Sequence, residues 1–280
     1  MKKTMILSPN SLTQSQLCMK RFEYYKIQNL VLNKTAKALN EGTLIHQILA
    51  DYYKGIMEHA DKTNLLQAIL TKARVDSIEM QMEVEDVDAC IKTCIDYFNY
   101  YQNDTWQPIA VEQMFSTSIF EDDELNLIIE GRIDLIVSAG EEKIIVDHKK
   151  EGRKSKRSIL DNQFICYPFV FGLNKTCQNV LGMQKSYPPE KRFERILHSY
   201  SKEHFQEWYE STIYQAKSIL RSSESGFFPR SYSSCNKWGG CPYKQICEST
   251  PDTRAWVIER DYMRSEFDLQ KEAVISEDDN

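Results

Sequence analysis

The alternation of apolar and polar residues is clearest between positions 127 and 146. Two runs rich in β-branched residues, 127–137 and 143–146, flank a turn-rich segment, 138–142, that contains Gly140. Such runs on either side of a short glycine-containing turn are typical of a β-hairpin. A third alternating segment, 108–120, precedes the hairpin and ends at Asp122 and Asp123. The pattern therefore predicts three adjacent antiparallel strands.

Helical periodicity dominates the first hundred residues. A capping signal at Ser8 is followed by apolar residues at helical spacing through Tyr25, and we expect Cys18 to lie within this first helix. A second helix is predicted over 42–57, and two more over 64–103 with a break near 80–86. These helices carry little recognisable chemistry, so we expect most of them to form a platform beside the sheet.

Apolar segments after the hairpin predict the remaining elements of the fold. Residues 158–172 are expected to form a helix on the sheet that Pro168 kinks or ends. The segment 179–187 is predicted to be a strand parallel to a central one, because a helix intervenes. An amphipathic helix is predicted over 202–220, and the residues after Lys271 are predicted to be disordered. The fold class is therefore α/β, with a central mixed β-sheet flanked by helices.

Four regions are predicted along the chain. Residues 1–107 form a helical region, 108–225 a sheet-containing core, 226–250 a cysteine-containing segment that clamps the C-terminus, and 251–280 a C-terminal tail. The boundaries follow the change from helical to strand periodicity and the position of the last three cysteines.

Composition is that of a globular protein, with 41% hydrophobic and 27% charged residues. No apolar run reaches the roughly 18 residues that a membrane-spanning helix needs. The first ten residues are too short and too soon interrupted for a signal peptide, so we expect a cytoplasmic protein. A formal net charge of −6 argues against wholesale nucleic-acid binding.

The charge is unevenly placed, however. Between positions 149 and 157 the chain carries six cations against Glu151 alone, and they are Lys149, Lys150, Arg153, Lys154, Lys156 and Arg157. Clusters of this kind hold phosphate backbones. The alternative interpretation is a solvated loop without a partner.

The predicted hairpin also brings acidic residues together. If its turn is centred between Gly140 and Glu141, Asp134 and Asp147 face each other, with Cβ atoms about 4.5–5.5 Å apart. Lys149 shares the face of Asp147 because strand side chains alternate. Two carboxylates beside an ammonium group predict a divalent-metal site. A solvated strand face is the alternative, and a register slip of one residue would remove the site.

Eight cysteines in a cytosolic chain are not expected to form disulfides. Four of them occur in helical or apolar segments and are predicted to be core residues: Cys90, Cys94, Cys166 and Cys177. Cys235, Cys241 and Cys247 are spaced at intervals of six around Gly239 and Gly240, which indicates a metal or cluster site. Three ligands require a fourth, and Cys18 is the leading candidate. The absence of paired Cys-x-x-Cys knuckles favours an iron–sulfur cluster over zinc, which stays open as an alternative.

Two polar positions on the predicted helices complete the pattern. His46 lies beside the apolar stripe of its helix, where a lone histidine is more often an edge residue than a ligand. Gln163 and Tyr167 are four residues apart and hence on one helical face.

These motifs together resemble the PD-(D/E)XK nuclease superfamily. Within it, the chain resembles the RecB/AddB-like branch with an iron–sulfur cluster, which includes CRISPR-adaptation nucleases, exonuclease V and phage recombination nucleases. The resemblance rests on Cys18, on Gly-Thr-x-x-His ending at 46, on Gly-Arg-Ile-Asp ending at 134, on Val-Asp-His-Lys ending at 149, on the Gln163–Tyr167 pair and on the last three cysteines.

The resemblance implies a restriction-endonuclease-like core and a set of site residues. It implies that His46, Asp134, Asp147 and the main-chain carbonyl of His148 bind Mg²⁺ or Mn²⁺, and that Lys149 is the catalytic lysine. It implies that Gln163 and Tyr167 position the scissile strand. Cys18, Cys235, Cys241 and Cys247 would be ligands of a 4Fe-4S cluster. Glu112 resembles an acidic strand residue of some relatives and is expected to support the site indirectly.

The function expected on this basis is a metal-dependent exonuclease that hydrolyses phosphodiester bonds of single-stranded DNA. It would act in recombination, repair or CRISPR adaptation, with proteins of those processes as candidate partners. The DNA backbone would be held by Lys150, Arg153, Lys154, Lys156 and Arg157. Two alternatives stay open: a DNA- or partner-binding module that does not cut, and a zinc-stabilised structural protein.

Overall fold

The computed structural model of the 280-residue chain describes residues 2–33, 37–151, 157–184, 186–237, 240–265 and 275–277. These residues form two compact units. The hairpin unit comprises Thr35–Met114 and Arg132–Lys202, and the terminal unit comprises Met1–Lys34, Phe115–Gly131 and Glu203–Asn280. Strands β3 (Gln107–Glu121) and β4 (Leu125–Ala139) each contribute residues to both units.

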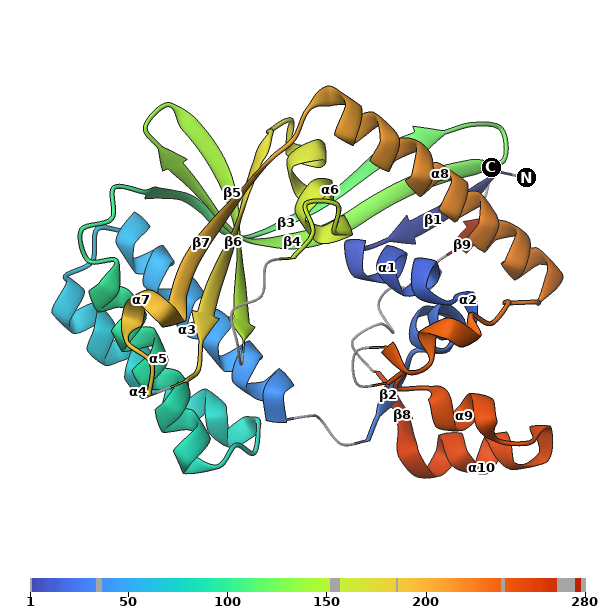
Figure 1. Cartoon of the computed structure of the whole chain (residues 1–280), viewed down its shortest axis with the longest axis horizontal. Helices are drawn as coiled ribbons and strands as arrows, with labels where there is room; N and C mark the ends of the chain where they lie inside the picture. Colours follow the sequence, from blue (N-terminus) through green and yellow to red (C-terminus); the bar gives the residue numbers. More distant parts are fainter. Residues whose placement is uncertain are drawn as a thin grey trace. The chain divides into compact units, whose positions relative to one another are not determined.

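The hairpin unit contains a mixed sheet in the order β7-β6-β5-β4, with β3 paired to β4 (Figure 1). Its remaining strands are β5 (Glu142–Glu151), β6 (Lys175–Gly182) and β7 (Phe193–Ser199). Strand β5 is antiparallel to β4 and parallel to β6, while β7 is antiparallel to β6. Leu135 pairs with Val146, so the expected hairpin register is confirmed. Gly140 makes this tight turn possible because it adopts a φ of +69°, which other residues rarely adopt.

Helices cover both faces of this sheet. On one face lie α3 (Lys37–Met57), α4 (Lys62–Glu79) and α5 (Val84–Tyr100), whose apolar stripes share a core with Leu135, Val137 and Val146. The side chains of Asp147 and Lys149 point the other way, toward α6 (Asn162–Phe171). A short helix, α7 (Pro189–Arg192), precedes β7. The predicted α/β fold with a central mixed sheet flanked by helices is confirmed.

The terminal unit combines both ends of the chain. Strand β1 (Lys3–Leu7) runs parallel to residues 125–129 of β4 and antiparallel to β9 (Ile275–Glu277). Helices α1 (Pro9–Leu17), α2 (Met19–Phe22) and α8 (Lys202–Ser225) contribute buried residues such as Leu12, Phe22 and Trp208. A second sheet pairs β2 (Leu30–Leu32) with β8 (Tyr262–Arg264).

Short helical segments connect the elements of the terminal unit. A π-helical turn, η1 (Glu23–Ile27), follows α2, and a 3₁₀ turn, η2 (Tyr232–Ser234), precedes α9 (Lys244–Glu248) and α10 (Pro251–Asp261). Tyr24, Leu30, Tyr243 and Tyr262 belong to a small core that ties these segments to the second sheet.

Several expectations about local structure are wrong. Cys18 is not inside the first helix: it lies between α1 and α2 in extended backbone, with φ −171° and ψ 121°. Pro168 does not end its helix, because α6 continues to Phe171 and stops at Gly172. The residues predicted to be disordered, those after Lys271, include strand β9. The N-terminal helical region also contains strands β1 and β2.

Other expectations are confirmed. The four cysteines predicted to be core residues, Cys90, Cys94, Cys166 and Cys177, are buried. The two helices predicted over 64–103 are α4 and α5, and the strand predicted at 179–187 is β6, shifted toward the N-terminus. None of the helices in the described ranges is long and apolar enough to cross a membrane.

Candidate active site

Two carboxylates of the β4–β5 hairpin form the centre of the candidate site. Asp134 accepts a hydrogen bond from the backbone N–H of His148 at 2.8 Å, and Asp147 is 1% exposed. Burial raises the pKa of Asp147; the positive charge of Lys149 opposes this and the negative charge of Asp134 adds to it. Its Oδ2 forms an ion pair with Lys149, whereas its Oδ1 accepts no hydrogen bond from the described residues. Burying a carboxylate oxygen without a partner is unfavourable, so Oδ1 is a candidate ligand for a second cation.

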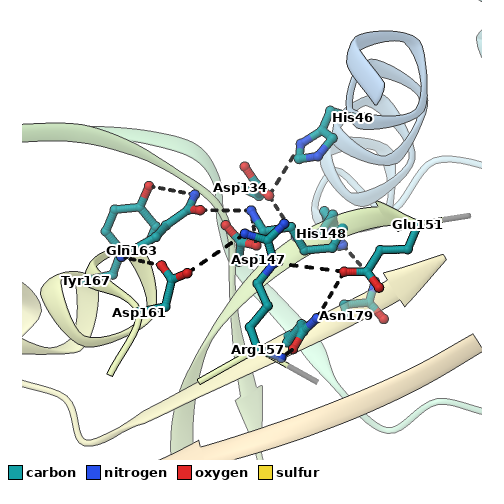
Figure 2. Close-up of polar contacts among 12 residues, drawn as sticks. His46, Asp134, Asp147, His148, Glu151, Arg157, Asp161, Gln163, Tyr167 and Asn179 are labelled. Atoms are coloured by element: carbon teal, nitrogen blue, oxygen red, sulfur yellow. Dashed lines mark hydrogen bonds and ion pairs between the residues drawn. The ribbon is translucent and has the colours of Figure 1, made fainter. Parts of the chain in front are cut away.

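Lys149 connects the hairpin to α6. Its Nζ lies 2.6 Å from Asp147 Oδ2 and donates a hydrogen bond to Gln163 Oε1 at 2.9 Å. The Nε2 of Gln163 donates in turn to the Tyr167 hydroxyl at 3.2 Å (Figure 2). Asp161 caps α6 by accepting from the Gln163 backbone N–H at 3.0 Å. The helical pair predicted from the sequence therefore lies against the catalytic lysine candidate.

His46 approaches Asp134 from α3, as Figure 2 shows. Its Nδ1 lies 3.4 Å from Asp134 Oδ2. Burial lowers the pKa of His46, but the hydrogen bond with Asp134 and the charges of Asp134 and Asp147 outweigh it, so the pKa is raised. For Asp134, burial acts in the other direction and raises the pKa, but the contacts with His46 and His148 outweigh burial and hold the pKa below its usual range. The pair therefore favours an ionised carboxylate at position 134.

The His148 side chain is fixed from the neighbouring strand. Asn179 is its register partner on β6, and Asn179 Nδ2 lies 2.7 Å from His148 Nδ1. Asn179 Nδ2 also donates to the Tyr97 hydroxyl at 3.0 Å, and the Tyr53 ring stacks on the His148 ring at 5.8 Å. Burial lowers the pKa of His148 to about 3, so its imidazole is neutral at ordinary pH. These contacts hold the backbone whose N–H binds Asp134.

A cavity of about 530 Å³ opens beside these residues. It is bordered by His46 and Lys54 from α3, by Glu112 and Arg132 from β3 and β4, and by Lys149 from β5. Glu112 Oε2 lies 2.8 Å from Arg132 Nε, and burial raises the Glu112 pKa. Glu112 has a φ of +54°, a strained conformation for a residue with a side chain. The cavity is thus large enough for part of a polymeric substrate and carries several cationic side chains.

The cysteines of the terminal unit gather at a different cavity, of about 260 Å³. Its lining includes Cys18, Cys235, Cys241 and Cys247. Burial raises the pKa of Cys247, and the thiolate charges of Cys241, Cys18 and Cys235 raise it further, while Arg230 lowers it. Ser231 donates its backbone N–H to Cys18 Sγ at 3.3 Å. The four thiols that the sequence grouped are therefore neighbours in space.

The aspartates of the hairpin unit have the donor type that a divalent cation prefers. Mg²⁺ needs one or two carboxylates with water and substrate oxygens, and Asp147 offers Oδ1, which accepts no hydrogen bond from the described residues. Among the residues that the structure describes, no three His, Cys, Asp or Glu side chains converge closely enough to form a complete metal site. The cysteine set therefore has the right chemistry and neighbourhood for a metal or cluster, but its thiols would have to move closer together.

The basic residues predicted to hold DNA are only partly described. Lys150 is mostly buried and forms an ion pair with Glu41 of α3. Arg157 is 43% exposed at its side chain and lies 3.9 Å from both Glu151 and Asp161. Arg153, Lys154 and Lys156 lie outside the described residues.

The sequence patterns did not predict the three residues that support His148, namely Asn179, Tyr53 and Tyr97. Asn179 was the first residue of a predicted strand, but its contact with His148 depends on the β5–β6 register, which the sequence does not specify. Tyr53 and Tyr97 belong to the apolar stripes of α3 and α5, where their hydroxyls look incidental. Buried tyrosines need hydrogen-bond partners, and this was the available signal.

Comparisons with known proteins agree with this arrangement. The chain belongs to the PD-(D/E)XK nuclease superfamily, whose family model matches residues 6–248. Nucleases of this superfamily typically use divalent metal ions. A comparison with curated proteins gives no match.

Two solved structures are similar at low identity. SSO0001 is 13% identical with a TM-score of 0.42, over 87% of this chain and 86% of that one. A protein from Eubacterium rectale, described as a candidate exonuclease, is 12% identical with a TM-score of 0.49, over 83% of this chain and 86% of that one. These scores are too low to support a functional assignment.

Proposed function

We propose that this protein is a metal-dependent deoxyribonuclease that degrades single-stranded DNA from its ends. The observation that supports it most is the buried Asp147 carboxylate, whose Oδ2 meets Lys149 while its Oδ1 accepts no hydrogen bond from the described residues. A buried carboxylate oxygen without a partner is costly, and a divalent cation would complete it. The neighbouring Asp134 and His46 supply further ligand atoms of the kind that divalent metals use.

The residues of the site have distinct roles in this proposal. Asp134, Asp147, His46 and the carbonyl of His148 would hold Mg²⁺ or Mn²⁺. When bound, the ion supplies positive charge that polarises a phosphodiester oxygen and lowers the pKa of water. Lys149 has three N–H donors, and two of them meet Asp147 and Gln163. Its third donor is directed to the substrate, where it stabilises the negative charge that develops on phosphate. Tyr167 holds Gln163, and Gln163 holds Lys149.

The preference for single-stranded DNA rests on the cavity and on the basic segment that follows it. Lys54, Arg132 and Lys149 place positive charge around the cavity. Arg157 and the cations between it and Lys149 follow directly in the chain, and such clusters track a phosphate backbone. Action from the ends, and a place in recombination, repair or CRISPR-adaptation processing, follow from the family resemblance and are part of the same proposal.

The four cysteines of the terminal unit are proposed to bind a 4Fe-4S cluster with a structural role. Support comes from their shared cavity and from the effect of the other three thiols, which raise the pKa of Cys247. Cys18 precedes the others by more than two hundred residues in the chain, so a shared ligand would close a very long loop. Anaerobic purification tests this, because a cluster gives broad visible absorbance and zinc gives none.

Cleavage assays test the nuclease proposal. Labelled single strands with free ends, with both ends blocked, and as circles are incubated with Mn²⁺ and wild-type protein or Lys149→Met. We expect wild-type protein to degrade only strands with free ends and Lys149→Met to bind these strands without cutting them. Cutting of circles would contradict the exonuclease mode. Failure of wild-type protein to cut any DNA form would favour a binding module.

A further inference from the structure

The hairpin unit contains a second cavity, of about 380 Å³, lined by both aromatic and polar residues. Its aromatic lining residues are Tyr52, Tyr53, Tyr97, Phe98, Tyr101 and Trp106. They come from the C-terminal halves of α3 and α5 and from the segment that leads into β3. Tyr53 and Tyr97 are almost fully buried, whereas Tyr52, Tyr101 and Trp106 are half-buried. The buried pair therefore lies deep in the cavity, and the other rings lie nearer its opening.

Polar contacts hold these rings in place. The guanidinium of Arg195 lies between Tyr101 and Trp106, at 3.9 and 4.0 Å from the two ring centroids. Arg195 also pairs with Asp104 at 2.6 Å and donates to the Tyr97 hydroxyl at 3.3 Å. The Tyr97 hydroxyl lies 2.9 Å from that of Tyr53. A rigid aromatic wall costs little entropy when a flat ligand stacks on it.

The charges of the cavity favour a neutral ligand over an anion. Asp104 offsets the positive charge of Arg195, and the guanidinium is already covered by two rings. A phosphate would therefore gain little there. A flat heteroaromatic ring would gain stacking on the half-buried rings and a hydrogen bond with the Tyr53 hydroxyl, because the Tyr97 hydroxyl is already saturated by Tyr53, Asn179 and Arg195.

The aromatic cavity and the nuclease cavity are separate, but both border α3 and β3. On α3, Lys54 borders the nuclease cavity and Ile56 borders the aromatic one. These two residues face different sides of the helix. On β3, Glu112 borders the first cavity and Pro108 the second, and four strand residues span about 13 Å. A DNA strand that runs along β3 from the nuclease cavity would therefore reach the aromatic cavity.

We propose that the aromatic cavity binds one nucleobase of the single DNA strand that occupies the nuclease cavity. This inference rests on the proposed nuclease function and specifies its substrate, a strand whose bases are unpaired. A paired base has its edge and both faces occupied in the duplex, so it cannot enter. Stacking supplies the affinity, and therefore all four bases are accepted.

The test uses oligothymidylates in which a single abasic residue is moved along the strand. Binding is measured by fluorescence anisotropy in Ca²⁺, with wild-type protein and Tyr52→Leu. Leucine keeps apolar packing against Phe98, on which Tyr52 stacks at 3.8 Å, but offers no ring. We expect one abasic position to weaken wild-type binding at least about fivefold. Tyr52→Leu should weaken the intact strand similarly and show no further loss at that abasic position.

Tyr187→Leu serves as the matched control, because this ring is 50% exposed and lies outside the cavity. Trp106→Phe provides a second variant that keeps a ring beside Arg195, and it should weaken binding less than Tyr52→Leu does. Two results would overturn the inference. One is an affinity that does not depend on the position of the abasic residue, and the other is an abasic residue that weakens binding by Tyr52→Leu as much as it weakens binding by wild-type protein. Cleavage by wild-type protein together with a flat scan would leave the nuclease assignment standing. A position-dependent scan without cleavage would support base binding in the aromatic cavity and contradict the nuclease assignment.

Discussion

The hairpin unit and the terminal unit each gather one set of candidate ligands, but they hold them by different means. Asp147 lies on β5, which pairs with β4 on one side and β6 on the other. Cys18 lies between two helices, Cys235 follows a single 3₁₀ turn, and Cys247 belongs to the five-residue helix α9. The first set is fixed by a sheet, and the second by short segments.

Burial differs in the same direction. Asp147 and His148 are almost fully buried, whereas all four cysteines are only partly buried. A sheet fixes its backbone through ladder hydrogen bonds before any ligand arrives. Short connecting segments have fewer such bonds and are ordered more by what they bind. The backbone of the candidate nuclease site is therefore held by the sheet without a ligand, whereas the candidate cysteine site would be ordered more by what it binds.

The largest expected effect is on the rate of DNA cleavage, and it comes from a substitution in the hairpin unit. Asp147→Asn removes a ligand charge and should lower the rate of DNA cleavage by about 10³-fold or more. Folding should change little by comparison, because the lost ion pair with Lys149 opposes the relief of burying the Asp147 charge. Single-turnover cleavage and thermal unfolding measure the two effects. Glu142→Gln, at the exposed end of β5, is the control. Cleavage at the wild-type rate would remove Asp147 from the mechanism.

Substitution at the cysteine site should instead lower the stability of the protein. Cys247→Ser is expected to abolish the visible absorbance of anaerobically purified protein and to lower the melting temperature by more than about 5 °C, because the bound ligand contributes folding free energy. Absorbance spectra, iron content and calorimetry measure this. Cys166→Ala removes a buried thiol outside the cavity and should keep the absorbance. A colourless wild-type protein that contains zinc would replace the cluster with the zinc alternative.

The pH dependence of stability tests how strongly burial acts on the nuclease site. Burial raises the pKa of Asp147 to about 6, whereas an unfolded aspartate titrates near 4. Between these values the native state binds more protons than the unfolded state, so the free energy of unfolding falls as pH rises from about 4 to about 6.

Urea unfolding of metal-free protein at pH 4.5 and 6.5 measures this change. Wild-type protein should lose roughly 1–3 kcal/mol more than Asp147→Asn over this window, because the variant has no group to titrate at that position. Equal losses in both proteins would show that Asp147 is ionised at pH 4.5 and that Lys149 offsets its burial.

The support from β6 should matter less than the ligands themselves. Asn179→Leu removes the contact with His148 Nδ1 and should weaken Mn²⁺ binding about tenfold, as loss of a supporting hydrogen bond does at other metal sites. Isothermal calorimetry measures it directly. Thr176→Val is the matched control, since Thr176 is buried on the same strand and contacts Tyr200 instead. An equal loss in the control would indicate a general effect of the strand.

The smallest effect is expected from the basic segment. Arg157→Ala should weaken binding of single-stranded DNA modestly and reduce the slope of log affinity against log salt by about 0.7, the value for one phosphate contact. Its ion pairs are long, so little stability is lost. Lys143→Ala, an exposed lysine near the hairpin turn, is the control. An unchanged salt slope would exclude Arg157 from the DNA path.

Much of the hairpin unit was predictable because local patterns there agree with the fold. The β-branched runs on both sides of Gly140 predicted the turn, and the turn predicted the β4–β5 register. The register in turn placed Asp134 near the Asp147 strand. The helix pair Gln163 and Tyr167 followed from a spacing of four residues.

Local patterns were misleading where the backbone is irregular. Cys18 looked helical because apolar residues flank it at helical spacing, yet its extended backbone separates α1 from α2. Pro168 looked like a helix end, but the packing of α6 against β5 and β6 outweighs the hydrogen bond that proline lacks.

The sequence by itself therefore determined the class of fold, the hairpin with its acids and lysine, and the grouping of four cysteines. Periodicity and turn chemistry act over a few residues, and the hairpin depends on nothing longer, whereas the grouping of Cys18 with the last three cysteines came from the need for a fourth ligand and from the family resemblance. The tertiary structure alone decided that Asn179 supports His148, that Glu41 pairs with Lys150, and that six aromatic residues enclose a cavity. Such contacts join residues tens of positions apart, and their geometry depends on strand order and helix packing, which local patterns do not encode.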